Sequence, residues 1–273
     1  MLVTFVGCAG AGKNTIIRDM IDAHPESYDL LPTLTTRAMR PGESQGDPYY
    51  FVTREEFEKQ IADGMIYEHE FVHKDIYGGS RLVLAEKRRS GKTLLKDIDI
   101  LGSATYKKTL SNEMRILSVF LYVSEEELLS RLRARGDKPE DIEMRSKRFQ
   151  MEIGLSGTSD YMVHNISREA TGQMIHRLIL AELQNEAYVP AARCARPTED
   201  EIARAAERIR LGEAPKPVRL GFNGKDIFIL EGADRYEAAR REGAFIQKVF
   251  DSLPDETIVC PGTKSRAKNR ACF

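Results

Sequence analysis

The chain has 273 residues, of which 41% are hydrophobic and 30% are charged, and its formal net charge at pH 7 is -1. This length allows more than one average domain and fewer than three, and a globular protein of this composition can bury a sizeable core. A net charge so close to zero gives no support for extensive binding to nucleic acid or to a membrane surface, so neither is expected as a partner.

The first predicted element is a buried strand at residues 2–6, a short apolar run rich in β-formers. This N-terminus lacks a charged region and a cleavage-site pattern, and no apolar run approaches the ~18–20 residues of a membrane span. Four cysteines lie far apart without metal-ligand spacing, which indicates reduced thiols: Cys8, Cys194, Cys260 and Cys272. We therefore expect a cytoplasmic protein.

A glycine loop follows the first strand, and apolar residues at helical spacing come next, from Ile16 to Ile21. Later apolar runs predict strands at residues 93–98, 116–123 and 161–163. Helical patterns separate these runs, at about residues 80–90, 103–111, 125–135 and 168–185. Alternating strands and helices are typical of an α/β fold with a parallel sheet and helices on both faces. Residues 33–78 interrupt the rhythm, and we interpret residues 40–43 as a loop.

A change of composition predicts two domains. The expected order is a first domain at residues 1–187, a linker at 188–197, a small α+β domain at 198–253 and a flexible tail at 254–273. In the small domain, Thr198 with Glu201 fits a capping box at a helix start. Asn223-Gly224 between two apolar runs predicts a hairpin. The expected order of its elements is helix, strand, strand, helix, strand.

Residues 7–13 satisfy the phosphate-loop pattern G-x-x-x-x-G-K, in the strand, loop, helix context that this motif requires. Glycines let the backbone curl so that several N–H groups point at phosphate oxygens, and the following helix adds partial positive charge. The lysine would bridge the β- and γ-phosphates of a nucleotide. The predicted phosphate-binding residues are Gly7, Gly10, Ala11, Gly12, Lys13, Asn14 and Thr15.

Asn14 stands where a serine or threonine usually gives its hydroxyl to Mg²⁺. The asparagine amide oxygen is also a hard donor, and Mg²⁺ keeps several waters in such sites. Asn14 is therefore the predicted metal contact, and Mg²⁺ with a nucleoside triphosphate is the expected cofactor.

Two arginines three residues apart, Arg37 and Arg40, come shortly before a pair of tyrosines, Tyr49 and Tyr50. Arginine offers forked donors to phosphate oxygens, and tyrosine adds a hydroxyl. This region therefore predicts a clamp for a second phosphate group.

With these motifs in this order, residues 2–185 resemble the guanylate kinase family. The runs that carry the resemblance, besides the loop, are TTRAMRPGE at 35–43, GDPYYF at 46–51, LLKDIDILG at 94–102, RLRARG at 131–136 and YMVHN at 161–165. Glu68, Tyr77-Gly78 and Arg145 belong to the same pattern. The resemblance implies a phosphate-loop nucleoside monophosphate kinase fold. It also implies transfer of the γ-phosphoryl group of ATP to GMP or dGMP, so that ATP and GMP are the expected partners.

The resemblance also implies roles for single residues. Thr33 and Glu68 match positions that read guanine, and Gly79 lies at a further base-binding position. Arg37, Arg40, Tyr49 and Tyr77 match positions that hold the phosphate of GMP. Asp97 and Asp99 match the acidic pair near the acceptor and the metal. Lys13 and the lid arginines, Arg131, Arg135 and Arg145, match the catalytic positions, where positioning and charge stabilisation carry most of phosphoryl transfer.

Four residues differ from the usual pattern of that family: Asn14, Pro48, Gly79 and Leu101. Pro48 and Gly79 lie near the expected acceptor, and they leave open a kinase of another small phosphorylated acceptor. Asn14 and the additional domain leave open a regulatory protein that binds a nucleotide without turnover. An active kinase of GMP is the leading hypothesis, because a pure switch has no need of a second phosphate clamp.

Residues from Lys216 to Arg240 resemble the ParB-like/sulfiredoxin-like fold. The resemblance is carried by Gly232, Arg235 and Ala238, which hold the positions of a Gly-x-x-Arg-x-x-Ala motif at a helix start. It implies an anion site at Gly232 and Arg235, which could take a regulatory nucleotide. Sulfiredoxin chemistry is excluded because Ala233 stands where the cysteine is needed. The alternative is an accessory domain in which Arg235 forms a structural ion pair.

Overall fold

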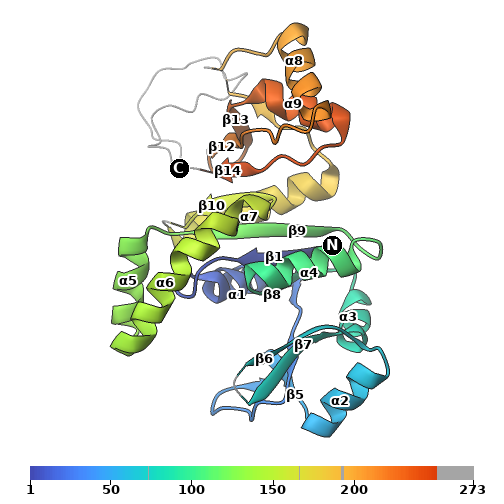
Figure 1. Cartoon of the computed structure of the whole chain (residues 1–273), viewed down its shortest axis with the longest axis vertical. Coiled ribbons are helices and arrows are strands. Elements are labelled where there is room, and N and C mark those ends of the chain that lie inside the picture. Colours follow the sequence, from blue (N-terminus) through green and yellow to red (C-terminus); the bar gives the residue numbers. More distant parts are fainter. Residues whose placement is uncertain (73, 166, 192–193, 251–273) are drawn as a thin grey trace. The chain divides into compact units, whose positions relative to one another are not determined.

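The computed structural model describes residues 1–72, 74–165, 167–191 and 194–250 (Figure 1). The chain packs into two compact units. The first unit comprises Met1–Val6 and Lys13–Ser118, and the second comprises Gly7–Gly12 and the residues from Val119 onward. This division does not coincide with the predicted boundary at residues 188–197, which stays a prediction. The predicted flexible tail lies outside the described residues.

Three parallel strands form the centre of the first unit. β8 (Thr93–Asp97) pairs with β1 (Leu2–Val6) on one side and with β2 (Tyr28–Leu30) on the other. The helices of this part are α1 (Lys13–Ala23), α3 (Arg81–Arg88) and α4 (Ile100–Leu110). Both strands predicted here are confirmed, because every side chain of β1 and most of β8 are buried. The core cluster is made of Leu2, Leu31, Val83, Leu84, Leu94, Tyr106 and Leu110.

Residues 33–78, which interrupt the predicted rhythm, form a second sheet of the first unit. Its strand order is β4 (Ser44–Gln45), β5 (Pro48–Phe51), β3 (Thr33–Thr35), β7 (Asp75–Ser80) and β6 (Ile66–Val72). α2 (Arg54–Ala62) begins at a capping box formed by Thr53 and Glu56. The predicted loop at residues 40–43 is confirmed. The other elements were missed because most of these strands are short and none shows a clean alternation of apolar side chains.

The sheet of the second unit has the strand order β11 (Val189–Pro190), β13 (Ile227–Glu231), β12 (Val218–Phe222), β14 (Lys248–Phe250), β10 (Tyr161–His164) and β9 (Ile116–Tyr122). Its helices are α5 (Glu125–Ala134), α6 (Pro139–Leu155), α7 (Arg168–Gln184), α8 (Glu199–Arg210) and α9 (Ala233–Glu242), with a 3₁₀ turn at Ser156–Thr158. The predicted order of elements after residue 198 is confirmed, including the capping box and the hairpin.

The sheet of the second unit is mixed. The predicted hairpin pairs β12 and β13 antiparallel, whereas β10 pairs in parallel with both β9 and β14. The short strand β11 lies in the range predicted as a linker, and Tyr188 before it is 5% exposed, with its hydroxyl 2.8 Å from that of Tyr161. α6 was not predicted, because its only buried side chains are Phe149 and Glu152, too few to make an apolar stripe.

No helix among the described residues is long and apolar enough to cross a membrane.

Candidate functional site

The loop between β1 and α1 has the geometry that its glycines predict. Gly7, Gly10 and Gly12 have φ angles of 127°, 99° and 96°, a region that other residues rarely adopt. A Cβ atom on Gly7 would stand 2.5 Å from the carbonyl oxygen of Leu121, and one on Gly12 would stand 2.7 Å from Nδ2 of Asn165. Backbone conformation and close approach therefore both require glycine at these positions.

Two side chains of the second unit hold the same carbonyl group of this loop. Nδ2 of Asn165 donates to the oxygen of Ala11 at 2.6 Å, and Nη1 of Arg131 donates to it at 3.3 Å. Nη2 of Arg131 also donates to the carbonyl oxygen of Asn165 at 3.0 Å and pairs with Glu127 at 2.6 Å. Arg131, predicted as a lid residue, is thus attached to the phosphate loop itself.

The other two predicted lid arginines, Arg135 and Arg145, share one carboxylate. Arg135 donates to Asp137 through Nε at 2.7 Å and through Nη2 at 2.5 Å, and Nη1 of Arg145 lies 2.9 Å from the same group. The hydrogen bond from Arg135 is the main cause of the lowered pKa of Asp137. The structure therefore brings Arg135 and Arg145 together around a carboxylate that the sequence analysis missed, and it places Arg131 elsewhere.

Lys13 is the first residue of α1, and its Nζ lies 3.6 Å from Oδ1 of Asp97, at the end of β8. The Lys13 side chain is 12% exposed and that of Asp97 is 31% exposed. Asn14 and Thr15 are exposed in the first turn of the helix, where backbone N–H groups lack intrahelical partners. This end of α1 can therefore bind anionic oxygens.

The same end offers the donor set that Mg²⁺ prefers. The carboxylate of Asp97 and the amide of Asn14 both provide hard oxygen atoms. The residues present therefore fit a magnesium ion that is held mainly by phosphate oxygens and water.

Asp99, the other member of the predicted acidic pair, is the N-cap of α4. Its Oδ1 accepts from the backbone N–H groups of Leu101 and Gly102, each at 2.9 Å. Oδ1 of Asp99 therefore caps the N-terminus of α4 by accepting these two hydrogen bonds.

The predicted phosphate clamp is built around Arg37. Its guanidinium group donates to both carboxylate oxygens of Glu43, at 3.0 and 2.8 Å, and lies 5.3 Å from the ring centroid of Tyr49. Tyr49 and Tyr77 pack edge to face with their centroids 5.7 Å apart. The hydrogen bond to Glu43 raises the pKa of Arg37. The backbone N–H of Arg40 donates to Glu43 at 2.8 Å, so that one carboxylate organises both predicted arginines.

The predicted base-reading residues, Thr33 and Glu68, both interact with a buried lysine. Nζ of Lys96 donates to Oγ1 of Thr33 at 2.6 Å. Burial raises the pKa of the Glu68 carboxyl, and this effect is opposed by the charge of Lys96 and by a hydrogen bond with Tyr106. Burial also lowers the pKa of Lys96 to about 8. The first unit therefore holds a cluster of partly compensated charges at the residues expected to read the base.

Gly79 differs from the expected serine or threonine because a neighbour takes its space. A Cβ atom there would lie 2.1 Å from the ring of Tyr67. The hydroxyl of Tyr67 donates to that of Tyr106 at 3.1 Å. The backbone of Gly79 hydrogen-bonds with Glu68. Gly79 therefore contacts Glu68 through its backbone, and Tyr67 stands where a side chain at position 79 would be.

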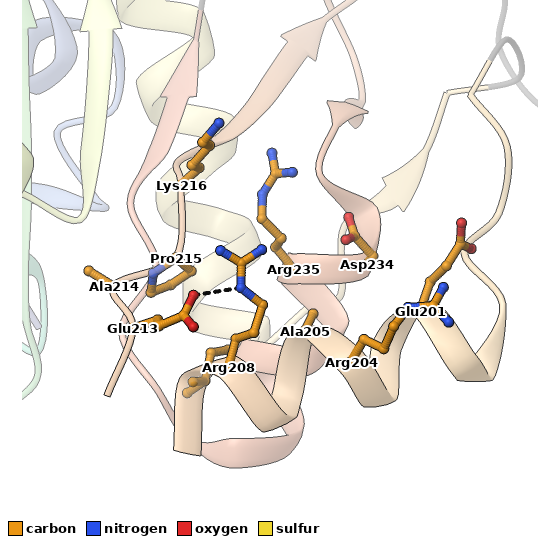
Figure 2. Close-up of a pocket in the computed structure, with 11 residues that line it drawn as sticks. Glu201, Arg204, Ala205, Arg208, Glu213, Ala214, Pro215, Lys216, Asp234 and Arg235 are labelled. Atoms are coloured by element: carbon orange, nitrogen blue, oxygen red, sulfur yellow. Dashed lines mark hydrogen bonds and ion pairs between the residues drawn. The ribbon is translucent and has the colours of Figure 1, made fainter. Parts of the chain in front are cut away.

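A second candidate site is a cavity of about 490 Å³ in the second unit (Figure 2). Side chains of α8, of the segment before β12 and of α9 line it. The basic residues are Arg204, Arg208, Lys216 and Arg235, and the acidic residues are Glu201, Glu213 and Asp234. Arg208 is paired with Glu213 at 2.6 Å, as Figure 2 shows.

Arg235 lies in the first turn of α9, three residues after the N-cap Gly232, which has a φ angle of 85°. Its Nη2 donates to the carbonyl oxygen of Pro217 at 3.3 Å and lies 3.6 Å from Oε1 of Glu231. Its Nε is buried without a hydrogen-bond partner among the described residues. The predicted structural ion pair is thus present as a long contact between Arg235 and Glu231, and Nε of Arg235 has no hydrogen-bond partner among the described residues.

The residues that the sequence analysis missed are Asp137, Lys96 and Tyr67. Lys96 carried a signal, since it is a charged residue that directly follows the apolar residues Leu94 and Leu95 inside a run predicted as a strand. Asp137 carried none, because an acidic residue just after a helix is common in protein sequences and is usually a surface residue.

Three comparisons with known proteins agree on one family. The family model described as guanylate kinase matches residues 1–182. The guanylate kinase of Photorhabdus laumondii is 36% identical over 177 residues, which are 64% of this chain and 84% of that protein. The guanylate kinase of Trichormus variabilis is 34% identical over 175 residues, 64% of this chain and 86% of that protein. The crystal structure of guanylate kinase from Anaplasma phagocytophilum is similar with a TM-score of 0.51 and 28% identity, covering 67% of this chain and 85% of that one.

Proposed function

The chain belongs to the guanylate kinase family, and from this premise we propose that it transfers the γ-phosphoryl group of ATP to GMP, or dGMP, to give ADP and GDP. It is an enzyme, a kinase. The observation that carries the proposal is the family match over residues 1–182, because this range contains every predicted donor-site and acceptor-site residue.

On the donor side, the backbone N–H groups of residues 7–13 would surround the phosphates of ATP, and Lys13 would neutralise the charge that develops during transfer. Arg131 and Asn165 support this role, since both hold the carbonyl group of Ala11 and so fix the shape of the loop. Guanylate kinases use ATP with Mg²⁺; here Asn14 and Asp97 would be its protein contacts. The ion, when bound, supplies further neutralisation of the phosphate oxygens.

On the acceptor side, Arg37, Arg40, Tyr49 and Tyr77 would hold the phosphate of GMP. The pairing of Arg37 with both oxygens of Glu43 orients its guanidinium group before substrate binds, which lowers the cost of ordering it during the reaction. The Glu68 carboxylate would accept from N1–H and the 2-amino group of guanine, a pair of donors that adenine does not offer. Arg135 and Arg145, held on Asp137, would contact the transferring phosphates when the lid closes.

The test is ADP production from ATP and Mg²⁺ with GMP, dGMP, AMP, CMP, UMP and IMP offered one at a time. We expect turnover with GMP and dGMP, weaker turnover with IMP, and none with AMP, CMP or UMP. Turnover with a different acceptor would transfer the assignment to that acceptor. ATP binding without turnover on any acceptor would favour the regulatory alternative.

For the C-terminal region, we infer an anion site in the cavity of Figure 2, at Arg235 and the N-terminal end of α9. The unpartnered Nε of Arg235 and the excess of basic over acidic lining residues support it. Phosphate groups, as in a regulatory nucleotide, have the charge and the oxygen acceptors that such a site takes.

Calorimetry of the full chain with pyrophosphate provides the test, and kinase active sites must first be saturated with ADP and GMP. We expect binding that Arg235→Gln weakens at least about tenfold, since a charge-assisted hydrogen bond contributes about 1.5–3 kcal/mol. Arg196→Gln, outside the cavity lining, is the matched control. Equal binding by wild type and Arg235→Gln, or none by either, would leave the ion pair with Glu231 as the role of Arg235.

A further inference from the structure

Lys96 is a buried cation in the middle of a sheet. It lies in β8 after two leucines that are fully buried, and it is itself only 2% exposed. Lysine is almost never fully buried unless its charge is compensated, because moving an ammonium group out of water is costly. None of the predicted roles of the reaction uses it.

The surroundings of the Lys96 ammonium come from four elements of the first unit. Thr33 on β3 accepts its shortest hydrogen bond, at 2.6 Å, and the carbonyl oxygen of Leu31 lies at 3.5 Å. The ring of Tyr106 on α4 has its centroid 5.6 Å from Nζ. The charges that act on it are Glu68 on β6 and its neighbour Asp97 on β8. The ammonium thus links Thr33 and Glu68, the two residues expected to read the base.

The hydrogen bond to Thr33 determines what that hydroxyl can do. An ammonium group has three donors and no acceptor, whereas a threonine hydroxyl has one donor and can also accept. Because Oγ1 of Thr33 accepts from Lys96, its own hydrogen must point to another acceptor. As long as Lys96 is charged, the Thr33 hydroxyl is therefore fixed as a donor.

We propose that Lys96 is a positioning residue for acceptor specificity, which holds the Thr33 hydroxyl as a donor toward the 6-oxo group of a purine while Glu68 accepts from N1–H. The proposal rests on the proposed function, and it names the acceptor class as 6-oxopurine nucleoside monophosphates. A 6-amino group is itself a hydrogen-bond donor, so it cannot accept from the Thr33 hydroxyl, and a 6-aminopurine is disfavoured at this position.

The test compares GMP with 6-thio-GMP, in which a weaker acceptor replaces the 6-oxo oxygen and every other group is kept. In Lys96→Met, of similar length without charge, we expect kcat/KM for GMP to fall roughly 10- to 100-fold, mostly through KM. The preference for GMP over 6-thio-GMP should shrink by about tenfold. Lys59→Met, in the same unit and 75% exposed, should change neither value.

Thr33→Val keeps the test decisive if Lys96→Met folds poorly. It should reduce the same preference by a similar factor and leave the preference for GMP over IMP unchanged, because those two differ only in the 2-amino group. The double variant should be no worse than the single variants, as expected for two residues that act as one unit. An unchanged preference for GMP over 6-thio-GMP in Thr33→Val, or in a folded Lys96→Met, would overturn the proposal.

Absence of any GMP turnover by wild type would instead contradict the proposed function, so the failure of the proposal and the failure of the proposed function are distinguishable.

Discussion

Replacement of Lys13 by methionine is expected to lower kcat with GMP by about 100- to 1,000-fold, the effect of removing one preorganised charge from a developing negative charge. Lys13 follows the glycine loop at the start of α1, and its ammonium group lies 3.6 Å from Asp97. Methionine keeps the length of the side chain and removes the charge. Steady-state ADP production with saturating ATP, Mg²⁺ and GMP measures the loss.

The fold should survive this substitution. A partly exposed ion pair at this distance contributes at most about 1 kcal/mol to the free energy of unfolding, so the thermal unfolding midpoint should shift by only a few degrees. Lys59→Met is the matched control and should have wild-type kcat. Wild-type turnover by Lys13→Met would remove the phosphate loop from the mechanism and, with it, the assignment as a kinase.

The substitution Glu68→Gln is expected to lower kcat/KM for GMP by about 100- to 1,000-fold, because two charge-assisted hydrogen bonds to guanine are weakened at once, each contributing about 1.5–3 kcal/mol. The amide nitrogen of glutamine would also face the N1–H donor of guanine. IMP lacks the 2-amino group and should lose less, so the ratio of kcat/KM for GMP to that for IMP should fall. Glu70→Gln, an exposed position of the same strand, should leave this ratio as in wild type.

The pH dependence of GMP binding gives an independent check on Glu68. Burial raises its pKa above the ordinary value of 4.5, and only the ionised form accepts from both guanine donors. KM for GMP in wild type should therefore fall as pH rises through this raised pKa, and Glu68→Gln should lack that limb of the profile. If both proteins show the same acidic limb, the limb belongs to the phosphate of GMP, and Glu68 does not read the base as an ionised group.

The two substitutions probe separate parts of the reaction. Lys13→Met should leave the preference among acceptor bases intact, since its proposed contacts are with phosphates. Glu68→Gln should change that preference while the loop still binds ATP. This difference between rate and selectivity is what distinguishes a kinase of GMP from a protein that only binds a nucleotide.

Features that depend on local chain geometry were predictable from the sequence. The three glycines of residues 7–12 predicted a curled loop, and all three have positive φ angles. Apolar runs predicted β1, β8, β9 and β10, whose side chains are largely buried. Asn223-Gly224 and the Thr198 capping box predicted the hairpin and the start of α8. Each signal lies within a few residues of the structure it specifies, because φ preference, capping and burial on one face are properties of short segments.

The sequence by itself also determined the family, through many short motifs in a fixed order, whereas only the tertiary structure decided which side chains meet. Lys96 donates to Thr33, 63 residues away, and Asn165 donates to Ala11, 154 residues away. Tyr67 fills the space beside Gly79, and Asp137 joins Arg135 to Arg145. Contacts of this kind depend on strand register and on the packing of distant segments, and a one-residue change of register would separate them. The local spacing of apolar residues does not predict such contacts. The role of Lys96, a lysine in a buried strand, could therefore be interpreted only once its contact with Thr33 was known.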